Sequence, residues 1–385
     1  MRVLITGANG FVGKNLILHL AERQDVQVHT FTSANDVELL PVLLQEADFV
    51  FHLAGVNRPK DTAEFMSGNL DLTQTLCRAV AAIAQSTGRK IRVVYTSSTQ
   101  ARRDNAYGAS KRGAEEALFA LRHAHCVPVY VFRLPNVFGK WCKPNYNSVV
   151  ATFCHNIARG LPIQVNDPAA QVTLVYVDDV IARFVGLMDE AGDVDCRALL
   201  AMTAAGDQDF ATVSPQYSTT VGELAQLIQS FKDSRETLIT ERVGTGLLRA
   251  LYATYVSYLP VESFAYVLPA HADPRGVFVE MLKTPDCGQF SFLTAAPGAT
   301  RGGHYHHSKT EKFLVIKGQA RFKFRHMQNG QTHELFTDGS KPEVVETVPG
   351  WTHDITNIGT DDMFVLLWAN EVFDRLRPDT FACPV

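Results

Sequence analysis

The sequence predicts a doubly wound parallel α/β sheet over residues 1–262, followed by an all-β domain over residues 263–385. The chain has 385 residues, and a single domain usually has ~150. Up to about residue 134, short apolar runs alternate with longer amphipathic ones, as in a parallel sheet covered by helices. After Pro260, glycine, proline and alternating apolar residues replace the helical pattern.

The first part contains continuous apolar runs, which are typical of strands buried on both faces. Helices are predicted at 69–85 and 110–123, and again at 220–232, where Thr220 and Glu223 have the spacing of a capping box. Residues 239–258 allow no assignment from their pattern. The predicted strands are Val3–Ile5, Val26–Val28, Phe49–Phe51, Ile91–Tyr95 and Pro128–Phe132.

The second part shows the alternation of half-buried strands and no long helical period. Six of the 13 histidines lie in its last 85 residues, which supports a boundary between about 258 and 272. The strands expected there are Val277–Val279, Phe290–Leu293, Phe313–Ile316 and Phe364–Trp368.

Composition limits the classes of function. Hydrophobic residues make up 46% and charged residues 20% of the chain, which indicates a folded protein. A net charge of −4 gives no basis for nucleic acid or an anionic membrane as the main partner, so small molecules are expected. No apolar run reaches the ~18 residues of a membrane span. Met1 leads directly into a strand without the pattern of a signal peptide, so a cytoplasmic location is expected.

A glycine-rich loop, Gly7 to Gly13, lies between the first strand and the first helix. Glycines at such a position permit a tight turn and a close approach of backbone to a pyrophosphate at the helix amino terminus. Three glycines alone would also fit an ordinary turn, but this context favours a Rossmann-type dinucleotide site. The predicted cofactor contacts in the loop are Gly7, Asn9, Gly10, Phe11, Val12 and Gly13.

Three further residues suggest reductase chemistry. Tyr107 and Lys111 are four residues apart at the start of a predicted helix, so both side chains lie on one face. A tyrosine is a poor acid at neutral pH unless a cation stabilises its phenolate, which Lys111 and a bound nicotinamide ribose could do. Ser98, at the end of the strand 91–95, would bind the substrate carbonyl. Alone, Tyr107 and Lys111 would be ordinary surface residues.

With this set, residues 1 to about 260 resemble the extended short-chain dehydrogenase/reductase family that acts on nucleotide sugars. The resemblance includes His52-Leu53-Ala54-Gly55 and the turn from Arg133 to Gly139. It implies a small substrate-binding lobe beside the sheet, and cofactor contacts from Leu53, Ala54 and Gly55 as well as Tyr107 and Lys111. The substrate contacts that it implies are Asn136, Lys143, Asn145 and Asn147.

Two departures from the family pattern narrow the chemistry. Thr99 and Gln100 stand where sugar 4,6-dehydratases carry Asp-Glu, and neither can act as a general acid or base at neutral pH, so a dehydratase is not expected. The second strand ends without the Asp or Glu that would bind an adenosine ribose 2′-hydroxyl, which favours NADPH over NADH. No arginine stands in its place.

A second constellation lies near the carboxyl end. His304 and His306 are two apart on a predicted strand and face the same side, Glu311 can return on the next strand, and His353 follows a Pro-Gly turn. Imidazole and carboxylate ligands suit Zn, Fe, Mn or Ni, so the ligand set alone does not choose the metal. We expect a divalent metal, with zinc as the first candidate.

The spacing of these residues resembles the two motifs of the cupin superfamily, which are small jelly-roll barrels. Upstream, residues 273–280 are similar to the opening of deoxysugar 3,5-epimerases built on cupin barrels, and this likeness implies Arg275 as a substrate contact. Those epimerases typically act without metal, whereas this chain keeps the whole metal set. Which residues transfer the proton therefore stays open.

Taken together, the two parts resemble the bifunctional bacterial capsule and O-antigen enzymes of the UDP-N-acetyl-L-fucosamine route. The resemblance implies C3 epimerisation of a UDP-2-acetamido-2,6-dideoxy-4-hexulose in the cupin, then NADPH-dependent C4 reduction to a UDP-2-acetamido-2,6-dideoxy-L-talose. The alternatives are an NAD-retaining UDP-sugar 4-epimerase with a non-catalytic cupin for sugar binding or oligomerisation, and a reductase whose non-catalytic cupin is a regulatory ligand sensor. A homodimer is expected because cupin barrels often pair.

Overall fold

The computed structural model describes residues 1–190, 210–269, 271–273, 276–278, 281–282, 288–371 and 376–385. The chain divides into two compact units. The first unit comprises residues 1–137 and 173–216, and the second comprises residues 138–172 and 217–385. The second unit therefore contains the all-β part together with helices from the middle of the chain.

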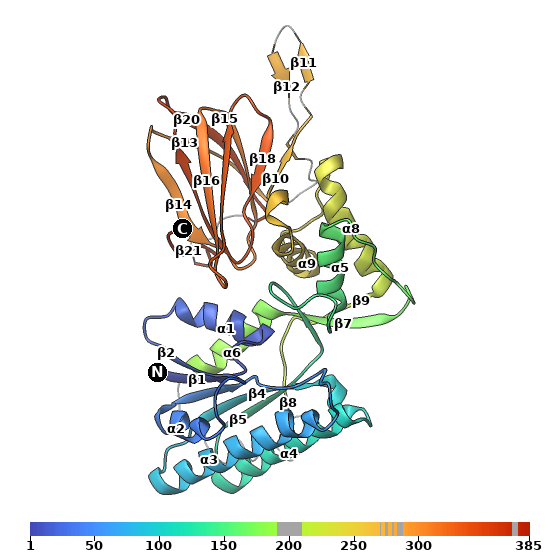
Figure 1. The fold of residues 1–385 in the computed structure, drawn as a ribbon, viewed down its shortest axis with the longest axis vertical. Coiled ribbons are helices and arrows are strands. Elements are labelled where there is room, and N and C mark those ends of the chain that lie inside the picture. Colours follow the sequence, from blue (N-terminus) through green and yellow to red (C-terminus); the bar gives the residue numbers. More distant parts are fainter. Residues whose placement is uncertain (191–209, 270, 274–275, 279–280, 283–287, 372–375) are drawn as a thin grey trace. The chain divides into compact units, whose positions relative to one another are not determined.

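A six-stranded sheet forms the centre of the first unit, and every strand pair in it is parallel (Figure 1). The strand order is β2-β1-β3-β4-β5-β8, which confirms the predicted doubly wound sheet. The strands are β1 (Arg2–Thr6), β2 (Gln27–Phe31), β3 (Phe49–His52), β4 (Arg92–Ser98), β5 (Val129–Leu134) and β8 (Phe210–Ala211).

Helices cover both faces of this sheet (Figure 1). Both faces need cover because successive side chains of a strand point to opposite faces of the sheet, as in β3. The ring of Phe51 lies 5.9 Å from that of Phe184 in α6, whereas Val50 packs in the core with Leu76 of α3 and Leu118 of α4. The helices are α1 (Phe11–Ala21) and α6 (Val177–Asp189) on one face, and α2 (Leu39–Glu46), α3 (Leu72–Thr87) and α4 (Ala106–His125) on the other.

Two helices begin at residues other than those predicted. α4 starts at Ala106 instead of Ser110, because the side chain of Asn105 caps it by accepting a 2.7 Å hydrogen bond from the backbone N–H of Gly108. α3 starts at Leu72 instead of Asn69, because a π-helical turn over Met66–Asp71 precedes it. The early start of α4 places Tyr107 in its first turn.

Among its described residues, the second unit has the α-helices α5 (Val149–Ala158), α8 (Val221–Thr237) and α9 (Gly246–Ser257). The predicted capping box of α8 is confirmed, since Thr220 and Glu223 exchange hydrogen bonds of 3.0 and 3.1 Å. Phe231 of α8 packs against Tyr252 of α9 at 5.2 Å between ring centroids. A small three-stranded sheet consists of β6 (Asn136–Phe138), β7 (Gln171–Tyr176) and β9 (Tyr217–Thr220).

The all-β part consists of two five-stranded antiparallel sheets and a hairpin, which confirms the predicted jelly-roll class. The sheet orders are β10-β18-β15-β20-β13 and β17-β16-β19-β14-β21. The strands are β10 (Ala265–Val267), β13 (Gln289–Ala295), β14 (Thr300–Tyr305), β15 (Glu311–Lys317), β16 (Gln319–His326), β17 (Thr332–Asp338), β18 (Glu343–Glu346), β19 (Trp351–Asn357), β20 (Met363–Ala369) and β21 (Phe381–Ala382), with the hairpin β11 (His271–Asp273) and β12 (Gly276–Phe278).

Aromatic side chains fill the space between the two sheets. The rings of Phe313 and Phe322 meet edge to face at 5.6 Å, and those of Phe264 and Trp351 do so at 5.1 Å. A buried ion pair joins the barrel to the helices: Glu346 binds Lys312 of β15 and Arg235 of α8. This pairing is one of the contacts that link the barrel and α8 within the second unit.

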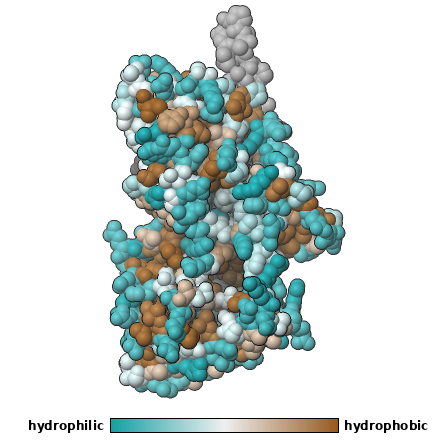
Figure 2. Space-filling view, in the orientation of Figure 1, coloured by the Kyte–Doolittle hydropathy of each residue, from teal (hydrophilic) through white to brown (hydrophobic). Residues whose placement is uncertain are grey.

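Charged and polar side chains are spread over the visible surface, with hydrophobic residues in small groups between them (Figure 2). Among the described residues, no helix is long and apolar enough to cross a membrane. This mixture of polar residues and small hydrophobic groups on the surface is expected from the composition of the chain.

Candidate functional site

The glycine loop of the first unit has the geometry that close approach of backbone requires. Gly7 has φ of +70°, and its N–H donates to the carbonyl of Phe31 at 2.9 Å. A Cβ at Gly7 would lie 2.6 Å from the backbone nitrogen of Ala54, and one at Gly13 would lie 2.5 Å from the carbonyl oxygen of Gly7. Only glycine fits at these two positions without moving the backbone.

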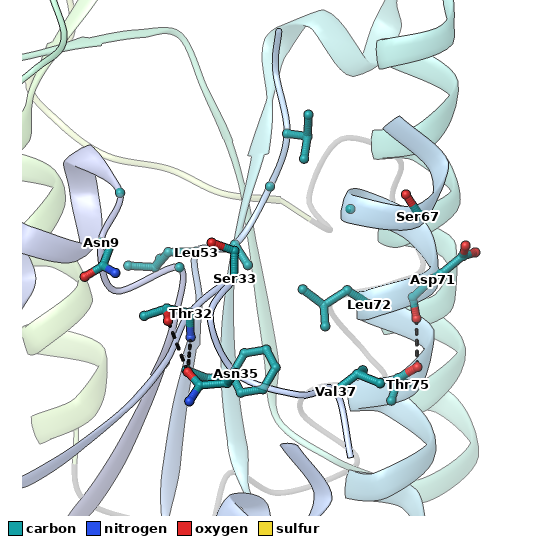
Figure 3. A pocket seen from close by; sticks show the side chains of 17 residues that line it. Asn9, Thr32, Ser33, Asn35, Val37, Leu53, Ser67, Asp71, Leu72 and Thr75 are labelled. Atoms are coloured by element: carbon teal, nitrogen blue, oxygen red, sulfur yellow. Dashed lines mark hydrogen bonds between the residues drawn. The ribbon is translucent and has the colours of Figure 1, made fainter. Parts of the chain in front are cut away.

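A cavity of about 730 Å³ opens beside this loop (Figure 3). Six of the predicted cofactor contacts line it: Gly7, Asn9, Gly10, Leu53, Ala54 and Gly55. Phe11, Val12 and Gly13 instead form the first turn of α1 and do not line the cavity. The remaining lining residues, which the sequence reasoning missed, are Phe31, Thr32, Ser33, Asn35, Val37, Val56, Ser67, Gly68, Asp71, Leu72 and Thr75.

The segment after β2 forms the polar wall of this cavity. The side chain of Asn35 accepts hydrogen bonds from Thr32, from its backbone N–H at 2.8 Å and from its hydroxyl at 3.1 Å (Figure 3). Thr32, Ser33 and Asn35 are neutral, so none of the residues of this segment that line the cavity carries a charge. These neutral side chains agree with the sequence, in which the second strand ends without an Asp or Glu.

Ser98, Tyr107 and Lys111 come together at the carboxyl end of β4 and the first turns of α4. A hydrogen bond joins the side chains of Ser98 and Tyr107. Burial raises the pKa of Tyr107, and the bond with Ser98 acts in the opposite direction. Tyr107 therefore stays protonated at neutral pH and can donate a proton.

Lys111 is almost completely buried, with 5% of its surface exposed. Its ammonium donates to the hydroxyl of Tyr95 at 3.2 Å and to the carbonyl of Thr96 at 3.0 Å. Burial lowers the pKa of Lys111 to about 8, while the charge of Glu115 opposes this shift. At neutral pH the ammonium is still the main form, and it lies close to the cofactor segment, since a Cβ at Gly55 would lie 3.2 Å from its nitrogen.

A hydrogen-bond chain connects the end of β1 to the turn before α3. The hydroxyl of Thr73 donates to the carbonyl of Asn69 at 2.6 Å, so it accepts from Nε2 of His52 at 2.8 Å. Nδ1 of His52 then accepts from the hydroxyl of Thr6 at 2.7 Å. Burial lowers the pKa of His52 to about 3, so this imidazole is neutral. The hydrogen bonds are therefore donated in one direction, from Thr6 to His52, from His52 to Thr73 and from Thr73 to Asn69.

Glu115 of α4 and Arg133 of β5 form an ion pair. Two hydrogen bonds of 2.9 and 2.6 Å join the guanidinium to the carboxylate, and Glu115 also accepts from Ser97 at 2.5 Å. Glu115 is only 3% exposed. The pair fixes α4 against the ends of β4 and β5, and therefore helps to position Lys111 one turn away.

In the second unit, His304, His306, Glu311 and His353 form one cluster on β14, β15, β19 and the turn after β14. Their donor atoms lie within 4.8 Å of one another. Nε2 of His306 and of His353 lie 3.1 and 3.5 Å from the same oxygen of Glu311. The structure therefore brings together the four side chains that the sequence predicted as metal ligands.

The donor set fits a divalent metal. The ring nitrogens of His353 are buried without a well-formed hydrogen bond, and Nε2 has only its 3.5 Å contact with Glu311, so a cation would satisfy Nε2. Burial lowers the pKa of His304 to about 4, and the neighbouring His306 and His353 lower the pKa of Glu311 against the effect of its own burial. Neutral imidazoles and an ionised carboxylate are the forms in which these groups bind metals.

Asp379 fixes the loop that carries His306. Nδ1 of His306 donates to the carbonyl of Asp379 at 2.6 Å, which leaves Nε2 facing the cluster. The carboxylate of Asp379 accepts backbone hydrogen bonds of 2.7 to 2.9 Å from His307, Ser308 and Lys309. The sequence reasoning missed Asp379, which lies 73 residues after His306 in the chain without a local motif.

A cavity of about 160 Å³ opens onto the histidine cluster. Apolar side chains from both sheets form most of its wall, and Arg301 and Asp354 contribute polar groups. The other lining residues are Leu293, Gly302, His304, Glu311, Phe313, Phe322, His353, Ile355 and Leu367.

The four expected substrate residues that the structure describes do not line either cavity. Asn136 is exposed, and its amide donates to the carbonyl of Thr173 at 3.1 Å. Lys143, Asn145 and Asn147 are exposed on one loop. Arg275 lies outside the described residues. These five assignments stay predictions.

Comparison with known protein families identifies both parts of the chain. Residues 3–196 match the NAD dependent epimerase/dehydratase family, and residues 271–381 match the polysaccharide biosynthesis C-terminal domain. The chain belongs to the NAD dependent epimerase/dehydratase family, and the matched range includes the glycine loop as well as Ser98, Tyr107 and Lys111.

Comparison with individual proteins extends the likeness over the whole chain. It is 60% identical to UDP-2-acetamido-2,6-beta-L-arabino-hexul-4-ose reductase of Pseudomonas aeruginosa, over 100% of this chain and 99% of the relative. Among solved structures, it is similar to the capsular polysaccharide assembling protein CapF of Staphylococcus aureus, with TM-score 0.64 and 41% identity over 100% of both chains. A CapF structure with the inhibitor 3-isopropenyl-tropolone gives a TM-score of 0.59 at 37% identity, also over both whole chains.

Proposed function

We propose that this chain is a bifunctional enzyme that epimerises C3 and then reduces C4 of a UDP-2-acetamido-2,6-dideoxy-4-hexulose. The observation that carries the proposal is the full-length likeness to a UDP-hexulose 4-reductase, joined to two separate candidate sites on one chain. A 4-keto sugar needs both activities, because the ketone acidifies the neighbouring C3 hydrogen and is then the group reduced. The product would be a UDP-2-acetamido-2,6-dideoxy-L-talose for capsule or O-antigen synthesis.

In the reductase step, bound NADPH would supply hydride to C4 of the sugar. The hydroxyl of Tyr107 would give its proton to the oxygen at C4, so that the ketone becomes an alcohol. Ser98 would hold that oxygen by a hydrogen bond during the transfer. The positive charge of Lys111, one turn further along α4, would stabilise the phenolate left on Tyr107.

Thr32, Ser33 and Asn35 support NADPH as the cofactor. They line the cavity at the end of β2, where a carboxylate would repel a 2′-phosphate. Their hydroxyls and amide can donate hydrogen bonds to phosphate oxygens. Of the predicted cofactor residues, Gly7, Asn9, Gly10 and the segment Leu53–Gly55 are those we assign to the bound dinucleotide.

In the epimerase step, a base would take the proton from C3, and an acid on the opposite face of the sugar would deliver a proton that exchanges with water. A divalent metal, with zinc as our candidate, would supply a positive charge to the oxygen at C4 while negative charge develops there. His304, His306, Glu311 and His353 would hold that metal. Asp379 would keep His306 in the required tautomer.

We further propose that the two activities correspond to residues 1–262 and 263–385, and that the enzyme is a homodimer working in the cytoplasm, where NADPH and nucleotide sugars are available. Asn136, Lys143, Asn145, Asn147 and Arg275 are proposed substrate contacts.

Cofactor use tests the reductase proposal against the NAD-retaining 4-epimerase. Purified protein is given a UDP-4-keto-6-deoxy-HexNAc with and without NADPH, and NADPH oxidation is followed by absorbance. Our proposal requires one NADPH oxidised per sugar reduced. Tightly bound NAD in the purified protein, with conversion of a UDP-sugar in the absence of NADPH, would instead select the 4-epimerase.

A further inference from the structure

In the second unit, Trp141 of the loop of residues 139–148 contacts the barrel at the turn of Gly350 and at His326 of β16. The indole of Trp141 lies against Gly350, where an added Cβ would be 2.9 Å from Cζ2 of Trp141. Gly350 also has φ of +82°, which favours glycine independently. The imidazole of His326 lies between Trp141 and Trp351, at 5.8 and 5.0 Å between ring centroids.

The turn at Gly350 is linked to two residues of the metal cluster, to His306 by a hydrogen bond and to His353 by the strand that follows the turn. The N–H of Gly350 donates to the carbonyl of His306 at 3.2 Å. The strand β19 begins at the next residue and carries His353. The N–H of Met327 also donates to the carbonyl of Gly350, at 3.0 Å. A displacement of this turn would therefore move the backbone of two metal ligands, His306 and His353.

The loop itself is held in a conformation that few residues adopt freely. Trp141 and Asn145 have φ of +68° and +53°, in the left-handed region that costs non-glycine residues energy. Contacts within the second unit hold the loop. The hydroxyl of Tyr258 donates to the carbonyl of Cys142, and the N–H of Asn145 donates to the hydroxyl of Thr152 at 3.0 Å.

We propose that Trp141 is a positioning residue for both sites, which transmits the state of the metal cluster to the loop of residues 139–148. The inference rests on the proposed function in one respect, namely that Lys143, Asn145 and Asn147 of this loop contact the UDP-sugar. The path is short: the indole of Trp141 packs on Gly350, and Gly350 is bonded to His306 and adjoins the strand of His353. Metal binding and sugar-nucleotide binding then strengthen each other.

The first readout is the affinity of the full-length protein for zinc, measured as zinc loss to a chelator at equilibrium, with and without saturating UDP. Coupling between two sites typically changes the affinity by about 5- to 150-fold. We expect UDP to raise the zinc affinity of the wild type by at least about 5-fold. Trp141→Ala should remove this effect, and Trp141→Phe should keep part of it because a ring remains against Gly350. Leu161→Ala, an exposed apolar residue of the same unit, is the control.

The second readout is amide hydrogen exchange in the zinc-loaded proteins. Trp141→Ala should raise exchange in residues 139–148 and leave β17 unchanged, whereas a general loss of stability would raise both. Equal UDP effects on zinc loss in wild type and Trp141→Ala, or unchanged exchange of the loop in that variant, would overturn the proposal. If UDP does not bind the wild type in calorimetry, the proposed function fails, and the exchange readout alone then decides whether Trp141 positions the loop.

Discussion

Replacing Lys111 by Met separates what this residue contributes to catalysis from what it costs in stability. The ammonium is buried, and its pKa of about 8 lies below the ordinary value of 10.5. Because the folded protein binds this proton less tightly than the unfolded chain, the charged lysine destabilises the fold at pH 7. That cost fades as the pH rises from 8 towards 10.5 and both states lose the proton.

The size of the effect follows from the shift. A lowering from 10.5 to about 8 corresponds to about 3 kcal/mol at pH 7. At pH 10 less than about 1 kcal/mol of it remains. Lys111→Met removes this cost but also removes the hydrogen bonds to Tyr95 and Thr96, each worth about 1 kcal/mol. We expect the variant to be about 1 kcal/mol more stable than wild type at pH 7, and about 1 kcal/mol less stable than wild type at pH 10.

Urea unfolding at pH 7 and pH 10, without cofactor, measures both free energies. Lys60→Met, which removes an exposed lysine of the same unit, is the matched control for loss of a positive charge. NADPH oxidation by Lys111→Met should be lost at both pH values. A stability difference between variant and wild type that is the same at pH 7 and pH 10 would refute the buried-charge argument. Substantial reductase activity would refute the catalytic one.

Three further outcomes are expected. Tyr107→Phe should lower NADPH oxidation by about 10²- to 10⁴-fold while leaving exchange of the C3 hydrogen intact, and more than a tenth of wild-type activity would contradict its role as acid. Arg133→Met should lower the free energy of unfolding by about 3 kcal/mol, because it leaves the buried Glu115 unpaired, and the double variant with Glu115→Gln should recover part of the loss in denaturant unfolding. His304→Ala and Glu311→Ala should each lose bound metal by elemental analysis, and wild-type metal content in both would mean that the cluster is only structural.

The parallel sheet and the glycine loop could be predicted because their signals are local. The continuous apolar runs became β1, β3, β4 and β5, with each face buried against a different helix layer. Tyr107 and Lys111 could be placed on one face because their spacing is that of a helix turn. The four metal-cluster residues could be grouped because strand alternation and glycine turns constrain their side chains.

Other features depend on contacts between distant residues, and no local pattern reports them. Asp379 reaches the loop after His306 across 73 residues, and Trp141 meets Gly350 from the other half of the chain. The middle of the chain joins the barrel in one compact unit, where Arg235 and Lys312 share Glu346. Residues 239–258 were unassigned because their apolar side chains are buried around much of α9, which removes the helical period.

The order of chemistry in the two sites can be tested most directly by NMR in heavy water. A UDP-4-keto-6-deoxy-HexNAc is incubated with the full-length enzyme, first without NADPH and then with it. We predict deuterium at C3 of the ketone before NADPH is added, and afterwards a 4-hydroxy product that carries deuterium at C3. Reduction of the ketone without any C3 exchange would contradict the epimerase assignment, and C3 exchange without reduction after NADPH is added would contradict the reductase assignment.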